Sequence, residues 1–177
     1  MQDFEITQAP LEIERKFLIA YPDIEILKRQ PSYRKLYIEQ TYLKTEADFL
    51  GGRIRCIKEG DAVRYIYTYK QKISDLTRYE YEKEISAEEY NELMLRRIEG
   101  SHTIVKDRHI FDYSGLTYEL DIYAFWEDQA TLEAEVDSEE TKIPIPPFLQ
   151  LIKEVTHDSR YNNSRLAFNL GVIEKKE

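Results

Sequence analysis

Polar and hydrophobic residues alternate along most of the chain, and this period of two predicts β-strands. The first such segment is 11–19 (LEIERKFLI). The other segments with this pattern are 37–43, 52–58, 63–73, 78–85, 102–111, 117–124 and 131–137. Their connections are short, and few helices are long enough to form parallel crossovers. The pattern therefore predicts a mainly β (α+β) fold whose antiparallel sheet is closed or nearly closed into a barrel.

Four short helices are expected beside this sheet. One covers 23–30 and stops at Pro31. A second begins at a capping box, in which Ser86 is followed three residues later by Glu89, and runs to about Arg97. The last two are predicted near 148–155 and 162–170. A chain of 177 residues suits one domain over 1–177, with 1–10 as an N-terminal extension.

The composition limits the classes of protein to which the chain can belong. Its 25 Lys and Arg against 34 Asp and Glu give a net charge of −9, which argues against a broad nucleic-acid surface. No apolar run approaches the roughly 20 residues of a membrane span, and the first residues lack the pattern of a signal peptide. The single cysteine, Cys56, excludes an internal disulfide and cysteine-rich zinc sites. We therefore expect a soluble cytoplasmic protein.

Charges of one sign gather on one face of several predicted strands, because side chains two residues apart point the same way. The cationic stripes are Arg53 with Arg55, Lys70 with Lys72, and Lys106 with Arg108; the acidic ones are Glu119 with Asp121, and Glu133 with Glu135 and Asp137. Solvated outer faces of a β-sandwich would explain any one stripe. A polar lumen would explain the whole set, since carboxylates suit Mg²⁺ or Mn²⁺ and cations suit phosphate. The pattern alone leaves both readings open.

Glu-x-Glu-x-Lys in the first segment, formed by Glu12, Glu14 and Lys16, resembles the signature of the CYTH superfamily, the triphosphate tunnel metalloenzymes. The similarity is to the short bacterial members and continues in order along the chain. The matching segments are 40–43 (QTYL), 53–55 (RIR), 68–70 (TYK), 78–82 (RYEYE), 106–108 (KDR), 119–121 (ELD), 134–137 (AEVD) and 154–164 (EVTHDSRYNNS). Asp137 stands where many relatives have Glu.

The resemblance implies an eight-stranded antiparallel β-barrel that forms a charged open tunnel with flanking helices. It implies that phosphate oxygens are bound by Lys16, Arg53, Arg55, Lys70, Lys106 and Arg108. It implies that Mg²⁺ or Mn²⁺ is bound by Glu12, Glu14, Glu135 and Asp137, with Asp121 as an additional ligand. Glu12 and Glu14 are also the candidates for orienting the attacking water, and so for the catalytic role.

The function implied is metal-dependent hydrolysis of a small polyanion, with inorganic tripolyphosphate as the expected substrate. Alternatives within the family are a class IV adenylate cyclase, a thiamine triphosphatase and a nucleotide or RNA triphosphatase. A non-catalytic polyphosphate-binding module is the alternative from another class. The sequence leaves open the metal, the oligomeric state, including a homodimer, and the roles of Glu80, Glu82, Glu84, Asp158 and Arg160.

Overall fold

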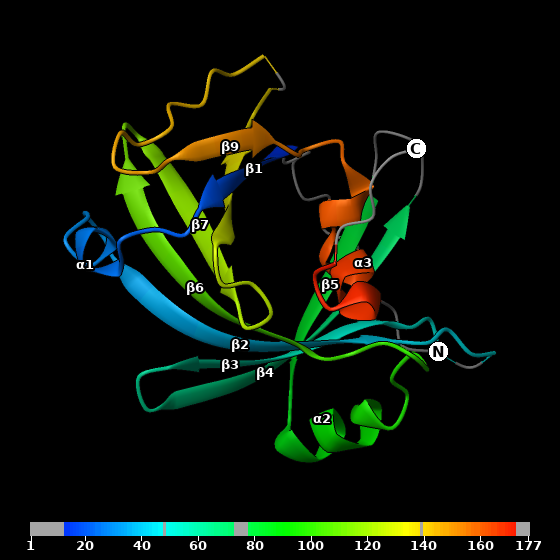
Figure 1. Ribbon diagram of the computed structural model, residues 1–177. Coiled ribbons are helices and arrows are strands. Elements are labelled where there is room, and N and C mark those ends of the chain that lie inside the picture. Colours follow the sequence, from blue (N-terminus) through cyan, green and yellow to red (C-terminus); the bar gives the residue numbers. More distant parts are fainter. Residues whose placement is uncertain (1–12, 48, 73–77, 139, 173–177) are drawn as a thin grey trace.

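The computed structural model describes residues 13–47, 49–72, 78–138 and 140–172, apart from the side chains of 70–72 and 78–80 (Figure 1). Glu12 and the side chain of Lys70, both predicted site residues, thus lie outside the described residues. The strands are β1 (Ile13–Ala20), β2 (Arg34–Leu43), β3 (Gly52–Glu59), β4 (Ala62–Lys72), β5 (Arg78–Ile85), β6 (Ile104–Tyr113), β7 (Leu116–Tyr123), β8 (Gln129–Val136) and β9 (Leu151–Glu154). The helices are α1 (Ile24–Leu27), α2 (Ala87–Met94), the 3₁₀ turn η1 (Ser159–Tyr161) and α3 (Asn163–Asn169).

All described strands belong to one antiparallel sheet, in the order β5-β4-β3-β2-β6-β7-β8-β1-β9. The sheet curls around a central space (Figure 1). Its edge strands are β5 and β9, and within the described residues no ladder of hydrogen bonds joins them. The mainly β, antiparallel prediction is confirmed. The predicted barrel is corrected to a curled sheet, because hydrogen bonding does not close the ring.

A ninth strand occupies a segment for which the sequence predicts a helix. Instead of a helix over 148–155, the chain forms β9, which pairs with β1 through Phe17 opposite Glu154 and Leu18 opposite Lys153. The free edge of β1 offers backbone partners to this segment, and that pairing overrides its local helical preference. The other helices form where predicted, but α1 ends at Leu27 rather than at Gln30, and α2 ends at Met94 rather than near Arg97.

The hydrophobic core lies mainly on the outer face of the curled sheet. Phe17 and Ile19 of β1 pack with Leu120, Leu132 and further buried residues beneath α1 and the segment that leads to β9. A second cluster, around Ile54 and Cys56, lies under α2, whose capping box is present as predicted. Because neighbouring side chains on a strand point to opposite faces, packing these residues outward turns the charged residues inward.

Apolar side chains also lie on the inner face, and one cluster of them borders the charged residues. Leu36, Ile38, Ile57 and Ile66 are buried together, with Ile110 packed against them. Each lies on the same strand face as the charged residues but two or more positions farther along its strand. The charged part of the inner face is therefore bounded at one end by hydrocarbon, which does not compete for ions or phosphate. No helix of the described residues is long and apolar enough to span a membrane.

Candidate active site

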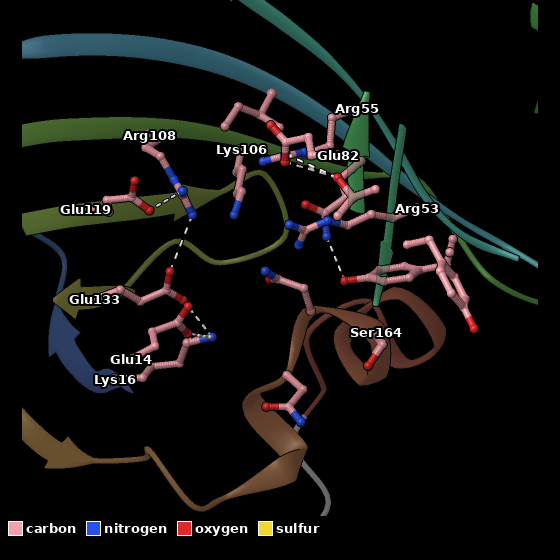
Figure 2. A pocket seen from close by; sticks show the side chains of 18 of the residues that line it. Glu14, Lys16, Arg53, Arg55, Glu82, Lys106, Arg108, Glu119, Glu133 and Ser164 are labelled. Atoms are coloured by element: carbon pink, nitrogen blue, oxygen red, sulfur yellow. Dashed lines mark hydrogen bonds and ion pairs between the residues drawn. The ribbon is translucent and has the colours of Figure 1, made fainter. Parts of the chain in front are cut away.

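The inner face of the sheet surrounds a cavity of about 810 Å³. Its charged lining residues are Glu14, Lys16, Arg53, Arg55, Glu82, Lys106, Arg108, Glu119, Glu133 and Glu135 (Figure 2). These side chains come from β1, β3, β5, β6, β7 and β8, and those labelled in Figure 2 point toward one shared space. The charged stripes seen in the sequence thus face each other across a lumen, as the polar-lumen interpretation predicts.

Most of the predicted site residues that can be placed meet at this cavity. Those that line it are Glu14, Lys16, Arg53, Arg55, Lys106, Arg108 and Glu135. Two others do not. Asp121 is completely buried and does not line the cavity, and Asp137 is exposed beyond the end of β8.

Asp121 is the counter-ion of two cations on β6. Its Oδ2 accepts from Lys106 Nζ at 2.5 Å, and Arg108 donates to both of its oxygens, at 2.7 and 2.8 Å. Burial alone would raise the pKa of Asp121, but the charges of Arg108 and then Lys106 outweigh it and hold that pKa well below the usual range. Burial, with the nearby charge of Arg108, lowers the pKa of Lys106. Asp121 is therefore an ion-pairing residue in this structure, and its role as a metal ligand stays a prediction.

Glu133 is a cavity residue that the predicted site omitted. Its Oε1 lies 2.6 Å from Lys16 Nζ and its Oε2 lies 3.4 Å from Arg108 Nη2, so it joins two cations. Burial lowers the pKa of Lys16, but the charges of Glu133 and Glu14 outweigh burial and raise it above the ordinary value. The alternation of β8 already marked Glu133 in the sequence. The prediction took Glu135 and Asp137 from the resemblance of 134–137 to the family motif and left Glu133 out; β8 ends at Val136, so Asp137 lies just beyond the strand.

On the opposite side, β3 supplies two arginines, Arg53 and Arg55, which we call the arginine wall. Arg55 Nη2 donates to Glu82 Oε2 at 2.7 Å and to Thr68 Oγ1 at 3.3 Å. The wall begins at Gly52, whose φ is +112° and where a Cβ would lie 2.4 Å from the carbonyl oxygen of Thr68. Only glycine allows β3 and β4 to approach this closely next to Arg53.

Uncharged polar groups complete the lining; they lie in segments that resemble the family, but no role was predicted for them. Gln40 donates to the Tyr42 hydroxyl at 2.7 Å, and both residues face the cavity. Burial raises the pKa of Tyr42, although the nearby Arg53 charge opposes this. Asn163, at the start of α3, also lines the cavity and accepts a hydrogen bond from the Tyr123 hydroxyl at 2.7 Å.

Comparison with known proteins identifies the family. The model of the CYTH domain matches residues 10–145. The chain belongs to the CYTH domain family. The resemblance carried by the Glu-x-Glu-x-Lys motif is thereby confirmed.

Two further relatives of this CYTH protein match nearly the whole chain. An inorganic triphosphatase from Acetivibrio thermocellus is 29% identical over 158 residues, which cover 89% of this chain and 94% of that protein. The solved structure of the inorganic triphosphatase NE1496 is 31% identical, with a TM-score of 0.56, and the match covers 89% of this chain and 94% of that one. The PH1819 protein from Pyrococcus horikoshii OT3 shares the fold at 24% identity, with a TM-score of 0.51 over 73% of this chain and 80% of that one.

The CYTH cavity offers oxygen ligands of the kind that a hard divalent cation prefers. Glu14 of β1 lies directly opposite Glu135 of β8 in the strand register, and both line the cavity. Like charges in such a cross-strand pair repel, and a bound cation would relieve that repulsion. Three or more His, Cys, Asp or Glu side chains do not gather into a metal-binding group within the described part of the chain. Glu14 and Glu135 therefore fit a divalent ion by donor type and position, as two ligands of a larger set.

Local contacts between Asp158 and Arg160 shape the turn at η1. Arg160 donates to Asp158 from Nε at 2.8 Å, and Asp158 also accepts from the backbone N–H of Arg160 at the start of η1. The next residues, 162–164, line the cavity, whereas Asp158 and Arg160 are not among its lining residues. In this structure Asp158 and Arg160 therefore form a local ion pair at the start of η1.

Proposed function

We propose that this CYTH protein hydrolyses triphosphates and that inorganic tripolyphosphate is its substrate. The observation that carries the proposal is a single cavity in which the arginine wall faces an acidic wall, formed by Glu14, Glu119, Glu133 and Glu135. Such a cavity presents donors for phosphate oxygens on one side and oxygen ligands for a cation on the other. The family and the 29% identity to an inorganic triphosphatase support this reaction.

The phosphate oxygens would be bound by Arg53, Arg55, Lys16 and Lys106, together with Lys70 from its place in the sequence motif. Lys16 keeps its charge across the neutral range, because Glu133 and Glu14 raise its pKa. Arg108, predicted to bind phosphate, already donates to Asp121 and Glu119 and contacts Glu133. Arg108 would therefore shape the wall that positions Lys16 and Lys106, in addition to its predicted contact with phosphate.

Glu14 and Glu135 would hold the divalent ion, and Glu12 of the Glu-x-Glu-x-Lys motif belongs to the same proposal. When bound, Mg²⁺ or Mn²⁺ would neutralise phosphate charge and lower the pKa of a coordinated water. The carboxylate of Glu14, whose side chain is half exposed, would accept a proton from the attacking water and orient it. The cations opposite would hold the phosphate chain in line for attack.

A panel of substrates tests the reaction and its specificity. We expect phosphate release from inorganic tripolyphosphate in Mg²⁺ or Mn²⁺, little release from ATP or thiamine triphosphate, and none in excess chelator. Restoring the ion should restore turnover. Undiminished turnover in chelator would contradict the metal proposal, and preference for ATP would contradict the substrate. Tight binding of tripolyphosphate without turnover in any metal would favour a binding module instead.

Replacing Arg55 with Ala is expected to weaken tripolyphosphate binding on the order of ten- to hundred-fold. The loss follows from a charge-assisted contact worth roughly 1.5–3 kcal/mol. Calorimetric titration without metal measures the dissociation constant. Arg29→Ala, which removes an exposed arginine that follows α1, serves as the control and should leave binding unchanged. Equal affinity of Arg55→Ala and wild type would remove Arg55 from the phosphate site.

A further inference from the structure

The cavity holds two arginines whose carboxylate partners differ in exposure. Arg108 is paired with Asp121, whose side chain is fully buried. Arg55 is paired with Glu82, whose side chain is 49% exposed, although Arg55 itself is only 14% exposed. Figure 2 shows Glu82 beside Arg55 on the arginine wall and Glu119 and Glu133 near Arg108 on the other side. The Arg55 guanidinium is thus fixed in the wall, whereas its partner reaches into solvent.

This difference in exposure decides which pair can open. Removing the partner of a buried pair leaves an uncompensated charge in a region of low dielectric, which is costly. Separating an exposed pair costs little, because water solvates the released carboxylate. An anion that enters the cavity can therefore replace Glu82 at Arg55 far more easily than it can replace Asp121 at Arg108.

We propose that Glu82 is a displaceable counter-ion of Arg55, which holds the guanidinium in place until a phosphate oxygen takes its position. The proposal rests on the proposed function in that the anion is a triphosphate. Thr68 supports the exchange: its buried hydroxyl lies 3.3 Å from Arg55 Nη2 and 3.4 Å from Glu82 Oε2. After Glu82 leaves, the contact with Thr68 still orients the guanidinium toward the cavity.

An attached carboxylate that competes for Arg55 weakens the binding of every anion that uses this arginine. It weakens the binding of the products as well as of the substrate, since phosphate and pyrophosphate carry the same oxygens. Glu82 would therefore favour the release of products that would otherwise occupy the cavity. This gives a specific role to one of the three β5 glutamates whose function the sequence left open.

Calorimetric titration with tripolyphosphate and with pyrophosphate, in excess chelator so that no turnover occurs, tests the competition. We expect Glu82→Gln to bind both anions about two- to fivefold more tightly than wild type, the factor that corresponds to an exposed ion pair. Glu119→Gln is the matched control. It removes the same charge from the same cavity, but Arg108 keeps both contacts to Asp121. Its effect on affinity should be clearly smaller.

The same titrations in an Arg55→Ala background isolate the pairwise effect. There, Glu82→Gln should give no gain in affinity. A gain that persists without Arg55, or one that Glu119→Gln matches, would show a general charge effect and overturn the proposal. Glu82→Thr, a second variant suited to a strand, guards against misfolding, and melting temperatures verify both. Unchanged or weaker binding by both folded variants would also overturn it.

These binding measurements are independent of hydrolysis. If Glu82→Gln binds the anions more tightly but the wild type shows no turnover with any metal, the counter-ion proposal stands and the hydrolase proposal is rejected. If the wild type turns over substrate but Glu82→Gln binds no more tightly, the hydrolase proposal stands and the counter-ion proposal is rejected.

Discussion

Replacing Asp121 with Asn is expected to lower the free energy of unfolding by about 3–5 kcal/mol, the cost of removing one partner of a buried ion pair. The substitution keeps the shape of the side chain but leaves Lys106 and Arg108 without the buried charge that both contact. Urea denaturation followed by circular dichroism measures the change. Asp107→Asn is the control, because Asp107 lies between Lys106 and Arg108 on β6 but pairs with Lys35 in a half-exposed salt bridge, whose loss should cost about 0–1 kcal/mol.

The pH dependence of this effect has a definite sign. The folded protein lowers the pKa of Asp121 below its ordinary value of 3.8. The stabilisation is therefore fully present above about pH 4 and is lost as the pH falls through the lowered pKa of the folded state. The difference in stability between wild type and Asp121→Asn should stay constant from pH 7 to about pH 4 and shrink below it. A difference under 1 kcal/mol at pH 7, or one that grows in acid, would contradict the ion-pair role.

Replacing Glu14 with Gln is expected to lower kcat on the order of 10²–10⁴-fold, the range associated with a positioned acid–base group. Glutamine keeps the size of the side chain but removes the charge that would bind the ion and orient water. Binding of tripolyphosphate in chelator should remain, because the cations that contact phosphate are untouched. The fold should not suffer either, since Glu14 faces Glu135 across the strands and losing one charge relieves repulsion.

Turnover and binding must be measured on the same preparation of Glu14→Gln, with its melting temperature. Glu25→Gln provides a control on α1, where Glu25 forms an exposed pair with Lys28 away from the cavity. Wild-type turnover in Glu14→Gln would remove Glu14 from the proposed chemistry. If binding and turnover fell together, Glu14 would contribute to substrate binding rather than to the chemical step.

Most of the fold could be predicted from the alternation of hydrophobic and polar residues, because each strand of such a sheet has one packed face and one polar face. The strands over 52–58 and 78–85 are within a residue of β3 and β5. Two features could not be predicted in the same way. The segment at Leu151 has no alternation of its own and becomes a strand only because β1 offers a free edge. Whether the sheet closes depends on the distance between β5 and β9, which no local pattern encodes.

For the candidate site, the sequence identified which faces are charged but not which charges pair with each other. Because side chains two residues apart share a strand face, alternation places Arg53 with Arg55 and, equally well, Glu133 with Glu135. It cannot distinguish a carboxylate that is available in the cavity from one that is buried and ion-paired with neighbouring cations, as Asp121 is. That distinction arises from the register between β6 and β7, where Arg108 lies opposite Asp121. Uncharged groups such as Gln40 give no periodic signal at all.

The two walls of the cavity differ in how much chain separates their contacting residues. On the arginine wall, Arg55 meets Thr68 and Glu82 only 13 and 27 positions away. On the acidic wall, Glu133 of β8 contacts Lys16 of β1, near the other end of the described chain. Closing so long a loop costs more entropy and slows folding. The arginine wall can therefore assemble first from local hairpins, whereas the acidic wall must wait until β8 reaches β1. Before β8 pairs with β1, the partly folded chain therefore exposes the cations of the arginine wall without the carboxylates that face them in the folded protein.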